Sequence, residues 1–182
     1  ARRILRENDI YDVAVEEVGG SLSDHYDPRD KVVRLSSENF HGHHLAGLAV
    51  AAHEVGHALQ HAQGYYPLNV RHAILPVANL GSQLGMPLIM AGMIFGAMGL
   101  VNIGVLFFAG AVLFQIVTLP VEFNASSRAM KLLAQGGYLA GDEVPSARKV
   151  LNAAALTYVA ATAAAVLQLF YYVMMARGRS DD

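Results

Sequence analysis

The chain has 182 residues, of which 54% are hydrophobic and 15% are charged. An average soluble domain carries about 25% charged and 45–50% apolar residues, so this composition favours a membrane protein. The apolar fraction excludes an intrinsically disordered chain. The net charge of -2 gives no basic surplus for binding nucleic acid. Because the chain has no cysteine, disulfides, thiolate zinc sites and iron–sulfur clusters are excluded.

Residues 1–42 are expected to form a small α+β cap. Residues 1–8 are typical of the end of a helix, and residues 12–18 alternate between apolar and polar side chains as a half-buried strand does. Two further short strands are predicted at 21–25 and 31–35, joined by a turn that contains Asp-Pro. The strand at 31–35 is expected to offer an edge to an extended substrate.

The segment 43–72 is predicted to carry a helix and its connection to the next part of the chain. The helix contains His53-Glu-Val-Gly-His57, an HExxH motif. Residues four apart lie on one face of a helix, so both imidazoles can reach one zinc ion at about 2.0–2.1 Å. Glu54 is placed to take a proton from a water at the metal, whose pKa zinc lowers to about 7. The motif thus supplies two ligands and a catalytic base and lacks one ligand.

Two long segments, residues 72–121 and residues 150–176, contain no Lys, Arg, Asp or Glu. A membrane-spanning helix needs about 20 apolar residues, so the first segment has room for two spans and the second for one. We predict a transmembrane hairpin over 84–120, with Asn102 at the tip of its turn, and a C-terminal transmembrane helix over 151–175. The alternative, a soluble protein with three buried helices, would leave too little polar sequence to cover them.

The missing ligand is expected to be a carboxylate that follows the hairpin. Glu122 is the first acid after it, in a segment, 121–150, that is predicted to be helical. Because a hairpin of two spans returns to the side it left, Glu122 and the HExxH helix are expected on the same side of the membrane. Asp142 and Glu143 are the alternative ligands. The alternative role for Glu122 is an interfacial salt bridge or a favourable contact with a helix dipole.

Other polar residues near the motif are weighed for further roles. Metzincin proteases place a Gly and a third His where this chain has Gln60 and Gln63, so that class is excluded. His61 is expected beside the site or at the surface, since three consecutive turns of a straight helix cannot curl around one ion. A second metal site at His41, His43 and His44 is the less favoured alternative to ordinary loop roles. An oxyanion donor is also needed; those considered are His25, Tyr26, Tyr65, His72 and Arg128.

The chain resembles the YugP-like family of bacterial membrane zinc metallopeptidases, often described as neutral zinc metallopeptidases. The resemblance is carried by residues 24–28, 31–36, 51–64, 119–126, 147–151 and 154–160. The layout is similar to that of the HtpX and CAAX prenyl protease gluzincins.

The resemblance implies one zinc ion per chain, held by His53, His57 and Glu122, with Glu54 as the base. HtpX enzymes often have an Asp, which orients a ligand His, where this chain has Ser126, so a hydroxyl or another residue would serve here. Family members usually carry one more span before the cap. The chain starts without Met inside a helical segment, so we expect it to be shortened.

The expected fold is a mainly α integral membrane protein with a small α+β cap, an HExxH helix, a transmembrane hairpin and a C-terminal transmembrane helix. The expected function is hydrolysis of peptide bonds in membrane-associated or unfolded proteins, and the expected partners are the lipid bilayer and a protein or peptide substrate. The alternative is a non-catalytic membrane protein with a structural zinc site or a partner-docking role. The oligomeric state stays open.

The distribution of cations predicts the orientation in the membrane. Of the 13 Lys and Arg residues, Arg177 and Arg179 lie beyond the last predicted span, and the others lie on the side of the cap, the HExxH helix and the segment 121–150. The positive-inside rule therefore places the zinc site on the cytoplasmic side of a multi-pass protein of the bacterial inner membrane.

Overall fold

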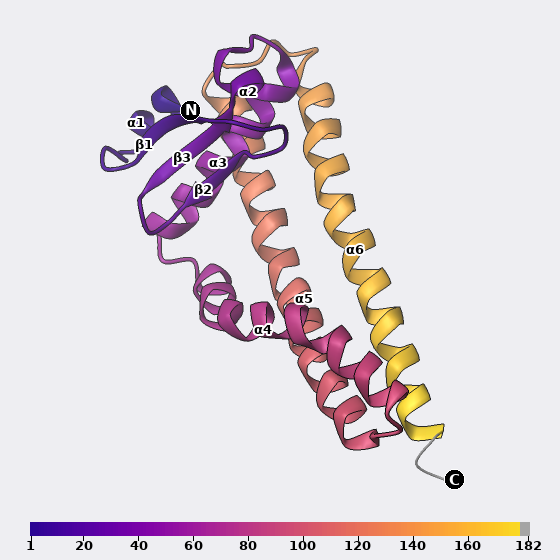
Figure 1. Cartoon of the computed structure of the whole chain (residues 1–182). Helices are drawn as coiled ribbons and strands as arrows, with labels where there is room; N and C mark the ends of the chain where they lie inside the picture. The colour runs from indigo at the N-terminus through magenta and orange to yellow at the C-terminus, as the bar shows by residue number, and fades with distance from the viewer. Residues whose placement is uncertain (179–182) are drawn as a thin grey trace. The chain divides into compact units, whose positions relative to one another are not determined.

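The computed structural model describes residues 1–178 (Figure 1). The chain divides into two compact units. The cap unit comprises Ala1–Leu68 and Val121–Leu156, and the hairpin unit comprises Asn69–Pro120 and the chain from Thr157 onward. Three long helices contribute to both units: α4 (Tyr66–Ile94), α5 (Met98–Gln135) and α6 (Val144–Gly178).

A three-stranded sheet in the cap unit consists of β1 (Ala14–Val18), β2 (His25–Asp27) and β3 (Val32–Ser36). The strand order is β1-β3-β2, with β1 parallel and β2 antiparallel to β3. The prediction that the strand at 31–35 offers a free edge is therefore wrong, because β3 is paired on both sides. Its side chains Val32, Val33 and Leu35 are almost completely buried, as those of a central strand are.

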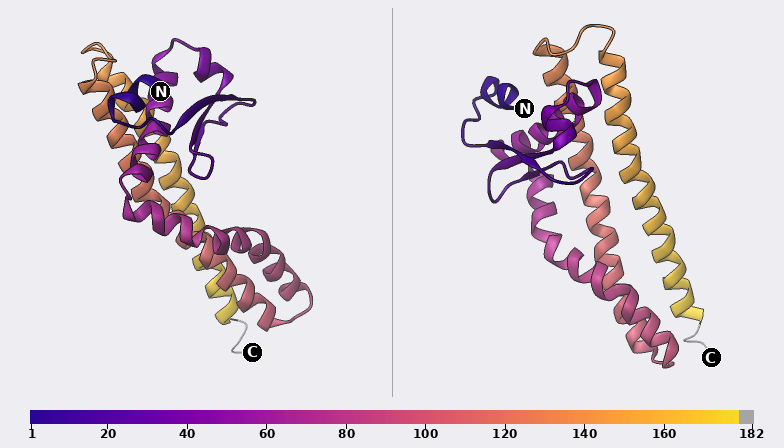
Figure 2. Two further views of the ribbon diagram at one scale, coloured as in Figure 1. Left: turned by 90° about the vertical axis from the view of Figure 1, so that its left-hand side faces the viewer. Right: turned by 45° about the horizontal axis from the view of Figure 1, so that its top comes forward.

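Three helices complete the N-terminal part of the cap unit: α1 (Arg2–Glu7), α2 (Ser37–His41) and α3 (Leu45–Ala62). The sheet packs against α3 (Figures 1 and 2). Helix α3 begins where the Nδ1 of His44 accepts a hydrogen bond from the backbone N–H of Gly47. It ends before Gly64, whose positive φ of +62° suits glycine. These boundaries place the HExxH motif in the middle of a continuous helix.

Small residues bring α3 and the cap-unit part of α5 into close contact. A Cβ atom at Gly56 would lie 2.7 Å from the carbonyl oxygen of Ala125, which is closer than such atoms can approach. Ala52, Ala125 and Ala129 are completely buried. The backbone of α5 therefore runs next to the turn of α3 that carries the motif.

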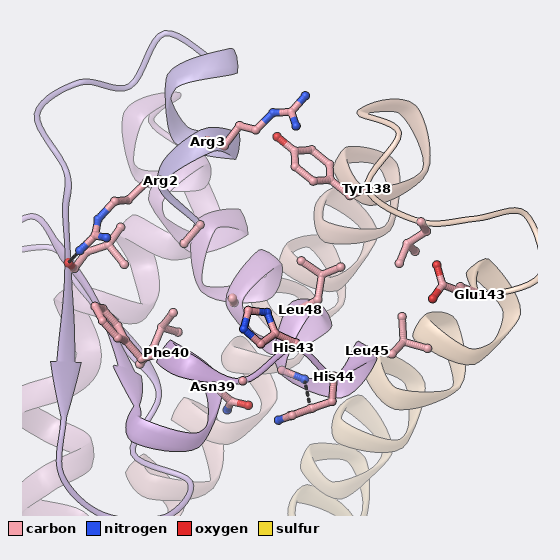
Figure 3. Close-up of a pocket in the computed structure, with 17 residues that line it drawn as sticks. Arg2, Arg3, Asn39, Phe40, His43, His44, Leu45, Leu48, Tyr138 and Glu143 are labelled. Carbon is pink, nitrogen blue, oxygen red and sulfur yellow. Dashed lines mark hydrogen bonds between the residues drawn. The ribbon is translucent and has the colours of Figure 1, made fainter.

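The cap unit also contains a cavity of about 570 Å³ whose walls come from α1, α2, α3 and the segment between α5 and α6 (Figure 3). His43 and His44 line this cavity, together with Arg3, Tyr138 and Glu143. None of the HExxH residues lines it.

In the hairpin unit, α4 and α5 pack tightly as an antiparallel pair. Cβ atoms at Gly85 or Gly104 would meet the opposite helix at 3.1 Å or less. The turn between the helices lies at residues 95–97, where Gly96 has a positive φ of +66°. The prediction of a turn tip at Asn102 is therefore wrong, since Asn102 lies within α5. Gly96 can adopt the left-handed conformation, which lets the chain turn after α4. Asn102 is polar, but it continues the helix.

All three long helices are long and apolar enough to cross a membrane. Many of their large apolar side chains are exposed, among them Ile94, Leu106 and Leu167. In a membrane, the bilayer would cover these apolar side chains. Prolines at positions 76 and 87 lie inside α4, and a further proline lies at position 120 of α5. The prediction of a mainly α membrane protein with a small α+β cap is confirmed.

Candidate metal centre

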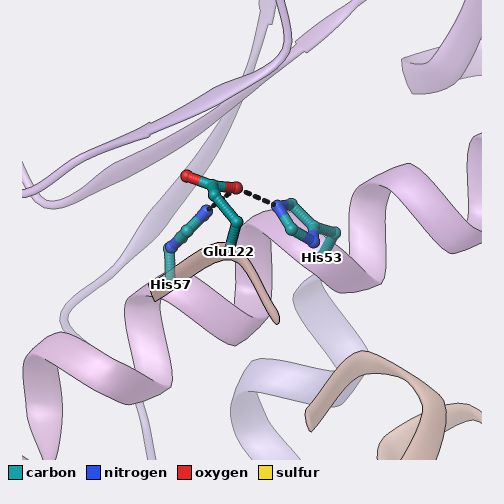
Figure 4. Close-up of side chains that lie close together, drawn as sticks. All are labelled: His53, His57 and Glu122. Atoms are coloured by element: carbon teal, nitrogen blue, oxygen red, sulfur yellow. Dashed lines mark hydrogen bonds and ion pairs between the residues drawn. The ribbon is translucent and has the colours of Figure 1, made fainter. Parts of the chain in front are cut away.

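The three predicted metal ligands converge in the cap unit (Figure 4). The Nε2 atom of His53 lies 3.1 Å from Oε2 of Glu122, and the Nε2 atom of His57 lies 3.5 Å from the same oxygen. One ligand atom from each residue can be chosen so that all three lie within 4.8 Å of one another. The two imidazole rings come from successive turns of α3 and are almost perpendicular, at 89°.

These distances fit a zinc ion. Ligand atoms bound tetrahedrally to zinc at about 2.0–2.1 Å lie about 3.4 Å from one another. The two distances to Glu122, 3.1 and 3.5 Å, bracket that value, and all three ligand atoms lie within 4.8 Å of one another. Two imidazole nitrogens and a carboxylate oxygen are all electron-pair donors, so a cation or a proton must lie between them. The Glu122 side chain is only 4% exposed, which restricts access of water to the group.

Gln60 orients the imidazole of His57. Its side-chain amide is completely buried. The Nε2 of Gln60 donates to the carbonyl oxygen of Val121 at 2.8 Å, and this carbonyl can only accept. The other amide atom, Oε1, must therefore be the one that faces Nδ1 of His57 at 3.0 Å, so Nδ1 carries the hydrogen. That tautomer leaves Nε2 of His57 with a free lone pair on the side of Glu122.

Ser126 holds the second imidazole. Its Oγ lies 3.1 Å from Nδ1 of His53, while Nε2 of the same ring faces Glu122. Ser126 follows Glu122 by one turn of α5, so one helix face supplies both the carboxylate and the hydroxyl. The hydroxyl that was expected to serve at this position therefore contacts a predicted ligand imidazole.

Glu54 lies beside the two imidazoles and is 8% exposed. Burial raises the pKa of its carboxyl group above the usual value, because a low-dielectric environment disfavours the charged form. The nearby His57 and His53 act in the opposite direction. A carboxyl group with a raised pKa is suited to accepting and returning a proton at neutral pH.

A polar network continues from Gln60 to the surface of the cap unit. Its Nε2 also donates to Oδ1 of Asn124 at 3.0 Å, and this oxygen accepts from Nε of Arg128 at 2.7 Å. A second guanidinium nitrogen of Arg128 donates to the side-chain oxygen of Gln63. The guanidinium also lies over the ring of Tyr65, 5.8 Å from its centroid. Arg128 thus ties the end of α3 to α5.

His61 does not join the metal-ligand group, as expected. Its Nδ1 lies 2.7 Å from the hydroxyl of Tyr26 on β2. Burial, with Asp12 and Asp27 nearby, raises the pKa of Tyr26 to about 12, so the hydroxyl in this contact stays protonated. The imidazole of His25 contacts the carbonyl of Ser23 at 2.7 Å. Of the remaining residues considered for the oxyanion, Arg128 and Tyr65 contact one another as described, and His72 lies in α4.

The second metal site considered for the other histidines does not form within residues 1–178. His41 pairs with Glu17 at 3.1 Å, and His44 caps α3. In the described part of the chain, the single group with metal-ligand geometry is His53, His57 and Glu122. Of the alternative third ligands, Glu143 accepts a hydrogen bond from the backbone of Ala140. Neither Asp142 nor Glu143 belongs to the group.

The sequence predicts the three converging residues but does not predict a role for Gln60. In the sequence pattern the absent metzincin ligand falls at Gln63, while Gln60 stands only where metzincins have a Gly. The signal was its spacing from His57, since residues three apart share a helix face, together with its polarity in an otherwise apolar segment.

Comparisons with known proteins identify the family of the chain. Residues 1–177 match the model of a family described as "putative neutral zinc metallopeptidase". The chain is 47% identical over all 182 residues to a Bacillus subtilis (strain 168) protein named "Putative membrane protease YugP", of which it covers 81%. No solved structure matches the chain. The match over residues 1–177 and the 47% identity show that this chain belongs to the family described as "putative neutral zinc metallopeptidase".

Proposed function

We propose that the protein is a membrane-embedded zinc endopeptidase of the HExxH-plus-Glu type, which hydrolyses peptide bonds in membrane-associated or unfolded proteins. One zinc ion per chain would be held by His53, His57 and Glu122. The observation that carries this proposal is the convergence of two imidazole nitrogens on one carboxylate oxygen, at 3.1 and 3.5 Å, with all three ligand atoms within 4.8 Å of one another. A bound zinc ion would polarise the scissile carbonyl and increase the acidity of water.

The chain's own residues would do the rest of the chemistry. Glu54 takes a proton from the attacking water, whose oxygen forms a bond to the carbonyl carbon. When the carbon–nitrogen bond breaks, Glu54 returns the proton to the amine nitrogen. The raised pKa of its carboxyl group suits this exchange. Gln60 keeps His57 in the tautomer that leaves Nε2 available for the ion, and Ser126 contacts Nδ1 of His53 and so orients that ring.

The site is proposed to lie near the cytoplasmic face of the membrane. The charge-free segments 72–121 and 150–176 mark the spans, and all but two of the cations lie in the remaining sequence before residue 150. The positive-inside rule favours the cytoplasm for that side. A site there would act on segments that emerge from the bilayer or on unfolded chains at its surface.

A structural zinc site is the second function considered. Structural zinc has four protein ligands, whereas the described residues bring three together. A position left for water or substrate, next to a buried carboxyl group of raised pKa, favours catalysis.

The test compares zinc content and cleavage of an unfolded protein by the full chain in lipid nanodiscs. We expect Glu54→Gln to retain the zinc of the wild type and to lose at least about 100-fold in cleavage rate, since the base is gone while the proposed ligands remain. The matched control is Glu16→Gln, which changes an exposed carboxylate on β1 and should leave both quantities unchanged.

Two results would contradict the proposal. Cleavage by Glu54→Gln at the wild-type rate would exclude Glu54 as the base. Zinc retained by both proteins, with no cleavage of any unfolded substrate by either, would favour the structural site.

A further inference from the structure

A groove between α5 and α6 lies within the cap unit, and none of His53, His57 and Glu122 lines it. Its volume is about 460 Å³. The lining residues include two cations, Lys131 and Arg148, and no acid. Within residues 1–178, neither cation takes part in an ion pair or a side-chain hydrogen bond. The groove thus has positive charge that no described side chain neutralises.

The large apolar ring of the groove, Phe123, lies toward one end and the cations toward the other, with the uncharged polar residues Ser126, Ser127 and Asn152 along its walls. On α5, Phe123 lines it eight residues before Lys131, which is about 12 Å along a helix. On α6, Ala155 lines it seven residues after Arg148, about 10 Å along the helix in the opposite chain direction. Phe123 and Ala155 therefore lie toward the same end of the groove, and Lys131 and Arg148 lie toward the other end.

The end of the groove at Phe123 and Ala155 lies toward the predicted membrane spans. This end adjoins the charge-free segments, since Phe123 comes just after residues 72–121 and Ala155 lies inside residues 150–176. The cationic end lies beyond the spans, on the side of the cap. A phospholipid in the same leaflet has the same order, with acyl chains toward the spans and phosphate toward the water.

We propose that this groove binds one anionic phospholipid of the surrounding membrane. Its phosphate lies between Lys131 and Arg148, and the glycerol and upper acyl chains lie against Phe123 and Ala155. Basic pockets between membrane helices are suited to anionic headgroups, because two cations attract a headgroup with a net negative charge more strongly than a zwitterionic one. An acidic peptide would satisfy the cations but would leave the end at Phe123 and Ala155 without an apolar partner.

The groove is separate from the metal centre, although Ser126 borders both. The Oγ of Ser126 contacts Nδ1 of His53, the ring nitrogen that faces away from Glu122. The lipid proposal therefore does not depend on the peptidase reaction, and its test needs no activity measurement.

The test is native mass spectrometry of the full chain released from detergent, with phosphatidylglycerol or phosphatidylcholine added at equal concentration. We expect the wild type to retain one phosphatidylglycerol in clear preference to phosphatidylcholine. Each cation near a membrane surface should account for roughly 5-fold in binding. The double variant Lys131→Gln/Arg148→Gln should therefore bind phosphatidylglycerol about 30-fold more weakly.

Three further variants make the result specific. The charge-preserving swap Lys131→Arg/Arg148→Lys should bind nearly as the wild type, which excludes loss by misfolding. Lys149→Gln changes the neighbouring cation on α6, which does not line the groove, and should have little effect. Arg6→Gln/Arg29→Gln removes two exposed cations elsewhere in the cap unit and should also retain the lipid.

The proposal is overturned if both lipids are retained equally by the wild type. It is overturned too if Lys131→Gln/Arg148→Gln retains phosphatidylglycerol as the controls do. Stronger binding of a short polyglutamate peptide than of phosphatidylglycerol would assign the groove to an acidic protein segment instead.

Discussion

The buried amide of Gln60 contacts the imidazole of His57 across 3.0 Å and at the same time holds the backbone of Val121, the residue before Glu122. One side chain thus orients an imidazole on α3 and positions the start of the segment of α5 that carries the carboxylate. Positioning contacts of this kind keep ligand atoms in place before an ion binds.

Replacing Gln60 by Leu should weaken zinc binding by about 10–100-fold, because Nδ1 of His57 loses its acceptor and the preferred tautomer is no longer fixed. Leaving Nδ1–H and the carbonyl of Val121 with fewer partners should also cost about 1–3 kcal/mol of stability. Zinc affinity is measured by competition with a chelator, and stability by thermal unfolding. Gln63→Leu, at the exposed end of the same helix, should change zinc affinity little. Wild-type zinc affinity in Gln60→Leu would exclude the positioning role.

Ser126 should contribute to zinc binding because it orients the other imidazole, that of His53. We expect Ser126→Ala to weaken zinc binding by about 10-fold, since Nδ1 of His53 loses its partner. Ser126→Asp should restore the binding, because a carboxylate is a stronger acceptor for the same ring hydrogen. The control is Ser127→Ala, which changes the exposed neighbouring residue. If Ser126→Ala and Ser127→Ala bind zinc equally, the contact with His53 contributes nothing to metal affinity.

Gly56 should tolerate no side chain, because its Cα faces the backbone of α5. The added methyl group of Gly56→Ala would lie 2.7 Å from the carbonyl oxygen of Ala125 and would push α5 away from α3. We expect a loss of about 1–3 kcal/mol in stability and weaker zinc binding, since Glu122 moves with α5. Gly99→Ala is the matched control, because nothing lies within 4 Å of a Cβ atom there. Equal zinc affinity in the two variants would show that α5 can move without affecting the site.

The orientation in the membrane can be tested because the chain has no cysteine of its own. We introduce single cysteines by Phe95→Cys, in the turn between α4 and α5, and by Asp142→Cys, in the segment between α5 and α6. A membrane-impermeant maleimide added to intact cells without an outer membrane should label the first variant at once. It should label the second only after permeabilisation. The opposite pattern would place the proposed metal centre outside the cytoplasm.

The sequence was informative where chemistry restricts the residue types. His53 and His57 were recognisable from their spacing, and Glu122 from its isolation within an apolar stretch. The long helices followed from the absence of charge, which the bilayer requires. In each case a physical constraint acts on composition or spacing, which are visible without coordinates.

Features that depend on pairing or on local backbone conformation were harder to predict. The central place of β3 in the sheet follows from its partners and not from its own residues. The turn at Gly96 depends on a left-handed conformation, and the polarity of Asn102 was a misleading signal for it. The role of Gln60 depends on a contact with α5, which is distant in sequence.

The most direct test of the central claim is the zinc affinity of Glu122→Gln compared with that of Glu143→Gln. The account predicts roughly a 100-fold or greater loss of zinc affinity in Glu122→Gln, because an amide oxygen replaces a charged ligand. It predicts no change in Glu143→Gln, whose carboxylate accepts a hydrogen bond from the backbone of Ala140. Wild-type zinc affinity in Glu122→Gln, with a loss in Glu143→Gln, would contradict the account.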